Sequence, residues 1–248
     1  MIKAGLDIGS RTIALVELDE SGIVSADVQD TTHNPAAECR RLLAKKDYAS
    51  LTATGYGRHL AAELFHAKVI TEIKAYALGA RHAKSGCRAI LDIGGQDVKV
   101  IALDEAGRVT DFEMNDRCAA GTGKFLEVMA AALGYSLAEF GEAALSATAA
   151  VKINSTCTVF AESEVVSLIA RGEPRNNIAL GLHEAAAGRV IAMLNRVGLS
   201  GDLFFAGGVA RNAAMREIVS KRLGATVYVP DNPQIIGALG AALNARSN

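Results

Sequence analysis

Two cysteines stand in similar local settings, and what their thiols do is the first question that this sequence raises. Cys118 lies in MNDRCAAGTGKF and Cys157 lies in INSTCTVFAESEVV, and small residues follow each of them. We expect both cysteines just ahead of helices, where the positive end of the helix dipole stabilises a thiolate and favours anionic ligands. Each thiol is a candidate for a buried core group, a nucleophile, half of a disulfide, or a metal ligand.

Two thiolates per chain do not complete a cubane iron–sulfur cluster, which takes four. A homodimer would supply the other two, because a closed dimer brings identical surfaces together around its two-fold axis. One cluster on that axis would then bind Cys118 and Cys157 of both chains. A disulfide between them is less favoured in the reducing cytosol that we expect. Cys39 is predicted to pack in a helix and Cys87 to begin a buried strand.

The composition excludes several classes of protein. The chain has 248 residues, 50% of them hydrophobic, which suffices for one large domain or two smaller ones. Its formal net charge is -1 and its basic residues do not cluster, so neither nucleic acid nor a membrane is an expected partner. No stretch approaches the ~20 uninterrupted apolar residues that a bilayer span needs. The five histidines show no ligand spacing and are predicted to be ordinary surface or helix residues. We expect a cytoplasmic protein.

An internal repeat indicates how the chain positions its chemical groups. The segment LDIGSRTIALVELDESGIV, residues 6–24, aligns without a gap on LDIGGQDVKVIALDEAGRV, residues 91–109, with nine of nineteen positions identical. Each copy reads as a strand, a tight glycine turn and a second strand. The period is too long for a solenoid, so the repeat predicts two duplicated lobes. We place the first lobe at residues 1–85 and the second at residues 86–248, with a return of the last helix onto the first lobe as the alternative.

Strands that alternate with helices follow both hairpins, which predicts an α/β architecture with helices covering the sheets. The strands expected beyond the hairpins are 23–30, 52–57 with its glycine turn, 108–115, 203–208 and 226–230. The expected helices are 36–46, 58–67, 119–133, 136–146, 159–171, 176–197, 212–223 and 233–246.

The glycine turns are candidates for phosphate binding, because glycines let backbone N–H groups come close to phosphate oxygens. Asp7 and Asp92 stand where a carboxylate would hold Mg²⁺ directly or through water, and Gln96 would orient an attacking water. A plain β-turn with a locally bonded Asp is the alternative for either copy alone. Gly207 and Gly208 follow an apolar strand and open a helix, where the backbone would pass close to the adenosine end of a nucleotide.

Over its whole length, the chain resembles the actin, sugar-kinase and 70-kDa heat-shock ATPases, which have two duplicated lobes with an ATP cleft between them. That resemblance implies nucleotide chemistry without fixing a function. Further motifs resemble the activators (archerases) of 2-hydroxyacyl-CoA dehydratases and the related ATP-binding subunits of benzoyl-CoA reductase. These motifs are GLDIGS, TGYGR, LDIGGQD, MNDRCAAGTGKFLEVMA, STCTVFAESEVVSLIARG, AGGVARN and PQIIGALGAAL.

The narrower resemblance implies a set of cofactors and partners. The cofactors are ATP/ADP, Mg²⁺ and one [4Fe-4S] cluster per homodimer, with Cys118 and Cys157 as ligands. The partners are an iron–sulfur dehydratase or reductase component, which receives a low-potential electron at the expense of ATP hydrolysis, and reduced ferredoxin or flavodoxin as electron donor. Such a system belongs to anaerobic metabolism. The predicted catalytic residues are Asp7, Asp92 and Gln96. The predicted nucleotide-binding residues are Gly9, Ser10, Arg11, Thr12, Ile13, Ala14, Gly94, Gly95, Gln96, Gly207, Gly208, Asn212 and Gln234.

The sequence departs from the resembled family at one position and leaves alternatives open. The family commonly has a lysine in the first motif where this chain has Ala14; Arg11 is the candidate replacement, and Lys99 fills the aligned position in the second copy. A small-molecule kinase with Asp92 or Asp97 as base is one alternative, although it leaves the two cysteines unexplained. A nucleotide switch or filament protein is another, and it predicts polymerisation without iron. The choice between a separable activator and a permanent component of a reductase also stays open.

Overall fold

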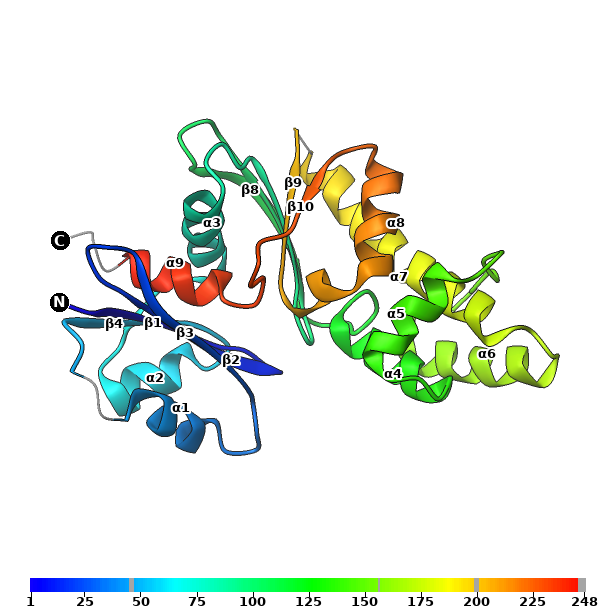
Figure 1. Cartoon of the computed structure of the whole chain (residues 1–248), viewed down its shortest axis with the longest axis horizontal. Helices are drawn as coiled ribbons and strands as arrows, with labels where there is room; N and C mark the ends of the chain where they lie inside the picture. The colour runs from blue at the N-terminus through cyan, green and yellow to red at the C-terminus, as the bar shows by residue number, and fades with distance from the viewer. Residues whose placement is uncertain (45–46, 156, 199–200, 245–248) are drawn as a thin grey trace. The chain divides into compact units, whose positions relative to one another are not determined.

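Two five-stranded sheets organise the described residues of the computed structural model, which are 1–44, 47–155, 157–198 and 201–244. Their strand orders are β3-β2-β1-β4-β5 and β10-β9-β6-β7-β8 (Figure 1). Read from its other end, the second order is β8-β7-β6-β9-β10, which matches the first position for position. The duplication predicted from two hairpins therefore extends to all five strands of each sheet.

The first sheet is built on the first glycine hairpin. β1 (Lys3–Ile8) and β2 (Thr12–Leu18) pair antiparallel, and β3 (Ile23–Asp30) pairs antiparallel with β2. On the other side of β1, β4 (Ser50–Gly55) and β5 (Lys68–Val69) add in parallel. The helices of this part are α1 (Pro35–Leu43), α2 (Arg58–Phe65), α3 (Glu72–Ala83) and α9 (Ile236–Asn244).

Helices cover both faces of the first sheet (Figure 1). Alternate side chains of β2 point to opposite faces, as the period of a strand requires. Ile13 packs in a cluster with Cys39 of α1 and Ala61 of α2. Ala14 packs instead against residues of α9, among them Ala238. β1 and β2 are therefore buried on both sides, which accounts for their nearly continuous apolar residues, whereas the edge strand β3 is largely exposed.

The second sheet holds the second glycine hairpin. Its strands are β6 (Ala89–Ile93), β7 (Val98–Leu103), β8 (Val109–Asn115), β9 (Leu203–Ala206) and β10 (Val227–Tyr228). The helices that follow are α4 (Gly123–Ala132), α5 (Leu137–Leu145), α6 (Thr158–Ala170), α7 (Arg175–Val197) and α8 (Ala213–Leu223), with a short 3₁₀ turn η1 (Gly208–Arg211) before α8. α4 packs on α6 and α7, and α5 packs on α7 and α8.

The chain divides into two compact units, and boundaries between them fall within the strands β6, β7 and β8 of the second sheet. Unit 1 takes Met1–Ile90, Ile101–Phe112 and the C-terminal segment from Pro230, and unit 2 takes Leu91–Val100 and Glu113–Val229. α9 thus packs in unit 1 although it lies at the C-terminal end of the described chain. The predicted boundary at residue 85 concerns the duplication and stays a prediction.

Most predicted elements are present, with shifted ends. The helix predicted at 119–133 begins only at Gly123, because residues 119–122 form a turn closed by a hydrogen bond from the Thr122 N–H to the Ala119 carbonyl (3.0 Å). The sequence analysis did not predict β5 or α3, although Thr71 caps α3 with its side chain. Residues 45–46 and 245–246 of two predicted helices lie outside the described residues.

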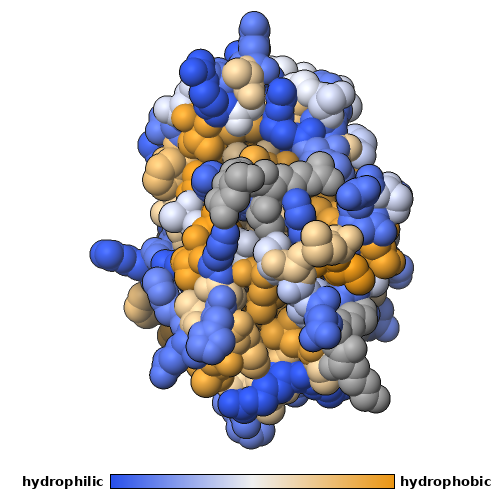
Figure 2. Space-filling view, turned by 90° about the vertical axis from the view of Figure 1, so that its left-hand side faces the viewer, coloured by the Kyte–Doolittle hydropathy of each residue, from blue (hydrophilic) through white to orange (hydrophobic). Residues whose placement is uncertain are grey.

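The surface mixes polar and apolar side chains. On the face that Figure 2 shows, hydrophilic side chains surround smaller apolar areas. In the ranges that the structure describes, no helix is long and apolar enough to cross a membrane. Large exposed apolar side chains gather on α6, where Val159, Phe160 and Val166 are 68%, 67% and 60% exposed. α6 therefore carries an apolar face that the described residues leave exposed.

Candidate functional site

In both hairpins, the first strand carries an aspartate that lies against a glycine of the neighbouring strand. A Cβ at Gly55, which ends β4, would lie 2.5 Å from Oδ1 of Asp7. A Cβ at Gly207, which follows β9, would lie 2.5 Å from Oδ1 of Asp92. Both glycines have φ of +84°, in the region that favours glycine. The TGYGR turn of unit 1 is thus the counterpart of the predicted adenosine turn of unit 2.

The first predicted phosphate turn is held by local hydrogen bonds. The Gly9 N–H donates to the Thr12 carbonyl (3.0 Å), which closes the turn. Thr31, after β3, donates its hydroxyl to the Gly9 carbonyl and its N–H to the Arg11 carbonyl, each over 2.9 Å. Arg11 is exposed at the tip, whereas Ser10 is half-buried. The turn is therefore fixed by its own backbone and by β3.

The first hairpin has Ala14 where the second has Lys99, and α9 lies beside it. Ala14 pairs with Asp7 in the register of β1 and β2, and its side chain packs against α9. Gly237, in the first turn of α9, lies against Oδ2 of Asp7. A lysine at position 14 would therefore compete with α9 for space, while the N-terminal end of α9 favours the carboxylate electrostatically. Ile13 is also fully buried, so the predicted nucleotide contacts of these two residues are limited to backbone groups.

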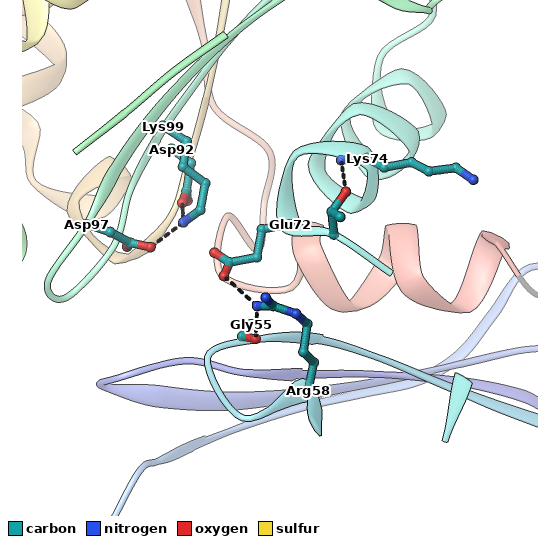
Figure 3. A network of polar contacts seen from close by, with 8 residues as sticks. Gly55, Arg58, Glu72, Lys74, Asp92, Asp97 and Lys99 are labelled. Carbon is teal, nitrogen blue, oxygen red and sulfur yellow. Dashed lines mark hydrogen bonds and ion pairs between the residues drawn. The ribbon is translucent and has the colours of Figure 1, made fainter. Parts of the chain in front are cut away.

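The second hairpin has a buried lysine at the aligned position. Lys99 is 2% exposed, and its Nζ lies 3.1 Å from Oδ2 of Asp92 and 2.5 Å from Oδ2 of Asp97 (Figure 3). Burying carboxylates is unfavourable unless a charge of opposite sign accompanies them. The Lys99 amine is therefore engaged by the two aspartates, and Asp92 sits in an ion pair. The predicted catalytic role of Asp92 stays a prediction.

The predicted water-orienting residue lies at the tip of the second hairpin. Gln96 is exposed, and the turn below it closes through a hydrogen bond from the Gly94 N–H to the Asp97 carbonyl (3.0 Å). The carbonyls of Gly94 and Gly95 accept hydrogen bonds from the N–H groups of residues 123 and 124, at the start of α4. The hairpin is therefore joined directly to the helix that follows Cys118.

A second polar pair fixes the predicted adenosine turn. Asn212 caps α8 by accepting from the Met215 N–H (3.0 Å), and its amide also donates to Nε2 of His183 (3.0 Å). His183 is fully buried and Nδ1 bonds the Ala179 carbonyl over 2.8 Å. Burial lowers the pKa of His183 to about 4, so the ring is neutral and Nε2 accepts. Gln234, the last predicted adenosine contact, is half-buried ahead of α9.

In unit 1, the arginine of TGYGR secures the turn after β4. Arg58 donates through Nη1 to the Gly55 carbonyl (2.9 Å) and lies 3.8 Å from Oε1 of Glu72 (Figure 3). Because Gly55 is packed against Asp7, Arg58 helps to hold the carboxylate end of β1. The TGYGR motif by itself does not predict this role of Arg58.

Accessibility separates the four cysteines, all of which are free thiols. Cys39 and Cys87 are buried, and burial raises the pKa of each to about 11. Both are therefore held as protonated core groups. Cys118 is half-buried and Cys157 is exposed, so the two thiols predicted as ligands are the accessible ones.

The predicted helix setting is right for Cys157 and wrong for Cys118. Cys157 is the residue immediately before the first turn of α6. Cys118 lies in the loop between β8 and α4, and Thr122 is the residue that precedes α4. In the ranges that the structure describes, no three His, Cys, Asp or Glu residues gather into a metal site.

The loops that carry the two thiols meet at one small hollow. Ala120 and Gly121 line it from the Cys118 loop, Ser155 lines it from the segment before Cys157, and Arg189 of α7 lines another side. The fold therefore brings the two cysteine-bearing segments of one chain together, although they are far apart in the sequence.

A known family of ATPases matches the chain over nearly its whole length. The model of the BadF/BadG/BcrA/BcrD ATPase family matches residues 4–245. The chain belongs to this family. The BadF/BadG/BcrA/BcrD family is one of ATPases, so the predicted nucleotide chemistry is confirmed at that level.

Characterised relatives match over nearly their whole length. The activator of lactoyl-CoA dehydratase from Anaerotignum propionicum is 44% identical, over 99% of this chain and 97% of the relative. The (R)-2-hydroxyglutaryl-CoA dehydratase activating ATPase from Acidaminococcus fermentans is 40% identical, over 97% of this chain and 95% of the relative.

Solved structures confirm the predicted fold class. The activator of the 2-hydroxyisocaproyl-CoA dehydratase from Clostridium difficile, with bound ADPNP, superposes with a TM-score of 0.90 at 38% identity, over 99% of this chain and 94% of that one. A ROK family glucokinase from Streptomyces griseus matches with a TM-score of 0.62 at 14% identity, over 100% of both chains, and shows the fold alone.

Replacing Lys99 with Met should destabilise the protein strongly, because it leaves the carboxylates of Asp92 and Asp97 buried without their ammonium partner. We expect the free energy of unfolding in urea to fall by about 3–5 kcal/mol. The double variant Lys99→Met with Asp97→Asn should recover part of that loss. Equal stability of Lys99→Met and the wild type would contradict the ion-pair assignment.

Acidification should destabilise the protein partly through His183. Its pKa is about 4 in the folded state against 6.5 as the ordinary value, so the unfolded chain binds more protons between these pH values. The stabilisation from neutral His183 is present above pH 6.5 and is lost as the pH falls toward 4, by up to about 3 kcal/mol. Urea unfolding at pH 7 and 4.5 should show that acidification lowers the free energy of unfolding less in His183→Gln than in the wild type. An equal decrease in both proteins would contradict the assignment.

Proposed function

We propose that this chain is an ATP-hydrolysing iron–sulfur activator that passes a low-potential electron to a 2-hydroxyacyl-CoA dehydratase. The observation that carries the proposal is full-length similarity to three proteins named as activators of such dehydratases. They are 44%, 39% and 40% identical to this chain, which covers 97%, 95% and 95% of their lengths. A component of benzoyl-CoA reductase from Thauera aromatica is 34% identical and covered over 72% of its length, which favours a separable activator over a permanent component of a reductase.

The nucleotide proposal rests on the two glycine hairpins. Their turns present backbone N–H groups suited to phosphate oxygens, with the hydroxyls of Ser10 and Thr12 as further donors. Asp7 is half-buried at the end of β1 and would hold Mg²⁺ directly or through water. Gln96 would orient the attacking water, and Gly207 with its neighbours would hold the adenosine. ATP hydrolysis by these residues would yield ADP and phosphate.

The cluster proposal rests on the chemistry of the two accessible thiols. Cys118 and Cys157 would be the ligands, since Cys39 and Cys87 are buried and protonated. When bound, a [4Fe-4S] cluster supplies a one-electron carrier. Because one chain offers two of the four thiolates required, a second copy would offer the other two. The exposed apolar face of α6, directly after Cys157, supports that homodimer.

The electron balance then follows. Reduced ferredoxin or flavodoxin would be oxidised by one electron, and the iron–sulfur dehydratase would be reduced by the same electron.

The alternative of a small-molecule kinase needs a carboxylate base. Its two candidates, Asp92 and Asp97, both have a carboxylate oxygen bound to the buried Lys99 amine, and this alternative leaves Cys118 and Cys157 without a role.

Protein purified without oxygen should contain about four irons and four acid-labile sulfides per two chains, and should give an electron paramagnetic resonance signal after dithionite reduction. Cys118→Ser and Cys157→Ser should each lose most of the iron, because each change removes two of the four thiolates of the dimer. Cys39→Ser and Cys87→Ser are the matched controls and should retain it. Full iron content in the Cys118→Ser/Cys157→Ser double variant would contradict the proposal.

A further inference from the structure

The Cys118 segment is bound to the second glycine hairpin through backbone atoms. The N–H of Gly123, the first residue of α4, donates to the Gly94 carbonyl over 2.9 Å. The N–H of Lys124 donates to the Gly95 carbonyl over 2.8 Å. The first N–H groups of a helix have no partner within the helix, so the hairpin supplies what α4 itself cannot. Two consecutive bonds fix both the position and the direction of the helix start.

This junction depends on the small size of residue 123. A Cβ there would lie 2.8 Å from the Gly94 carbonyl oxygen, which is closer than real Cβ atoms come to backbone. Any larger residue must therefore push α4 away from the hairpin and lengthen both hydrogen bonds. The first of these bonds would be affected most, because it starts at the substituted residue.

The segment between Cys118 and the junction is itself tied at both ends. The Asn115 amide donates to the Cys118 carbonyl over 2.9 Å, and β8 ends at this asparagine. The Thr122 hydroxyl donates to the Ala119 carbonyl over 2.6 Å. A displacement at the start of α4 is therefore transmitted through a short, hydrogen-bonded loop to the cysteine.

The Cys157 segment is anchored in a different way. Glu164, two turns into α6, accepts hydrogen bonds from the N–H groups of Asn154 (3.0 Å) and Ser155 (2.9 Å) and from the Asn154 amide (2.9 Å). Burial opposes ionisation of Glu164, but these hydrogen bonds outweigh it and lower its pKa. Val151 donates further back to the Asn177 carbonyl of α7 (3.1 Å). This loop is thus bound to helices α6 and α7.

We propose that Gly123 is a positioning residue that makes Cys118, rather than Cys157, respond to nucleotide at the second hairpin, while Glu164 holds Cys157 in place in both states. The inference rests on the proposed function, since it takes the hairpin as a phosphate site and the two thiols as ligands. A nucleotide shifts a conformational equilibrium only by its differential affinity for the two states. Phosphate bound to the turn changes the placement of the Gly94 and Gly95 carbonyls, and these carbonyls hold α4.

The test measures each thiol separately in the full chain, prepared without its cluster under anaerobic conditions. Iodoacetamide alkylation is followed by mass spectrometry for every cysteine, with and without ADPNP and Mg²⁺, while calorimetry measures nucleotide binding. In the wild type, the alkylation rate of Cys118 should change by about fivefold or more with nucleotide. The rate of Cys157 should not change, and buried Cys39 and Cys87 serve as slow internal references.

Variants assign the response to the junction. Gly123→Ala should bind nucleotide and lose the response of Cys118. Gly188→Ala is the matched control, because its Cβ would meet only the end of the Arg222 side chain, at 3.2 Å, and it should keep the response. Glu164→Ala should speed alkylation of Cys157 equally with and without nucleotide.

The outcomes separate the inference from the function on which it rests. Nucleotide binding with equal responses of Cys118 and Cys157, or with a response that survives Gly123→Ala, would overturn the inference and leave the proposed function standing. The comparison of the Cys118 and Cys157 responses in the wild type needs no variant, so it tests the inference even if Gly123→Ala does not fold. Absence of nucleotide binding in the wild type would overturn the proposed function, and the inference with it.

Discussion

A carboxylate packed against a glycine of the neighbouring strand is the constraint on which both hairpins depend. Oδ1 of Asp7 and Oδ1 of Asp92 each take the space that a side chain at the facing glycine would need. The carboxylate, the end of the neighbouring strand and the glycine turn are therefore fixed together in each unit. Because a glycine with positive φ tolerates this approach, the turn can bring backbone close to a ligand as well. The same constraint recurs in both sheets, which share one strand order.

The constraint leaves the Asp92 carboxylate buried and the Asp7 carboxylate half-buried, and the two units stabilise these carboxylates differently. Unit 1 places the first turn of α9 beside Asp7, and Ala14 leaves room for that helix. Unit 2 buries Lys99 between Asp92 and Asp97. The duplicated hairpins are therefore unequal in their charged residues. The second hairpin also accepts hydrogen bonds from the start of α4, so it is connected through that helix start to the Cys118 loop.

The sequence predicted the duplication, the α/β class and nearly all elements, because those follow from apolar periodicity and a repeated motif. It could not predict what depends on tertiary packing. The packing of Ala14 against α9 is one example, because the two are far apart in the sequence. Cys118 was assigned to a helix start because Ala and Gly residues suit either a helix or a turn, and the Thr122 and Asn115 side chains decide for the loop. The sequence predicts His183 to be an ordinary surface or helix residue, whereas the structure buries it; its apolar neighbours at helical spacing are the signal of that burial.

The account's central claim is that ATP hydrolysis by this chain delivers an electron to a 2-hydroxyacyl-CoA dehydratase. The most direct measurement mixes the dithionite-reduced protein with oxidised lactoyl-, 2-hydroxyisocaproyl- or (R)-2-hydroxyglutaryl-CoA dehydratase and follows dehydration of the acyl-CoA. The account predicts that at least one dehydratase becomes active with ATP and Mg²⁺, and that none does with ADPNP or without nucleotide. Activation that is equal with and without ATP, or ATP hydrolysis that activates none of the three, would contradict it.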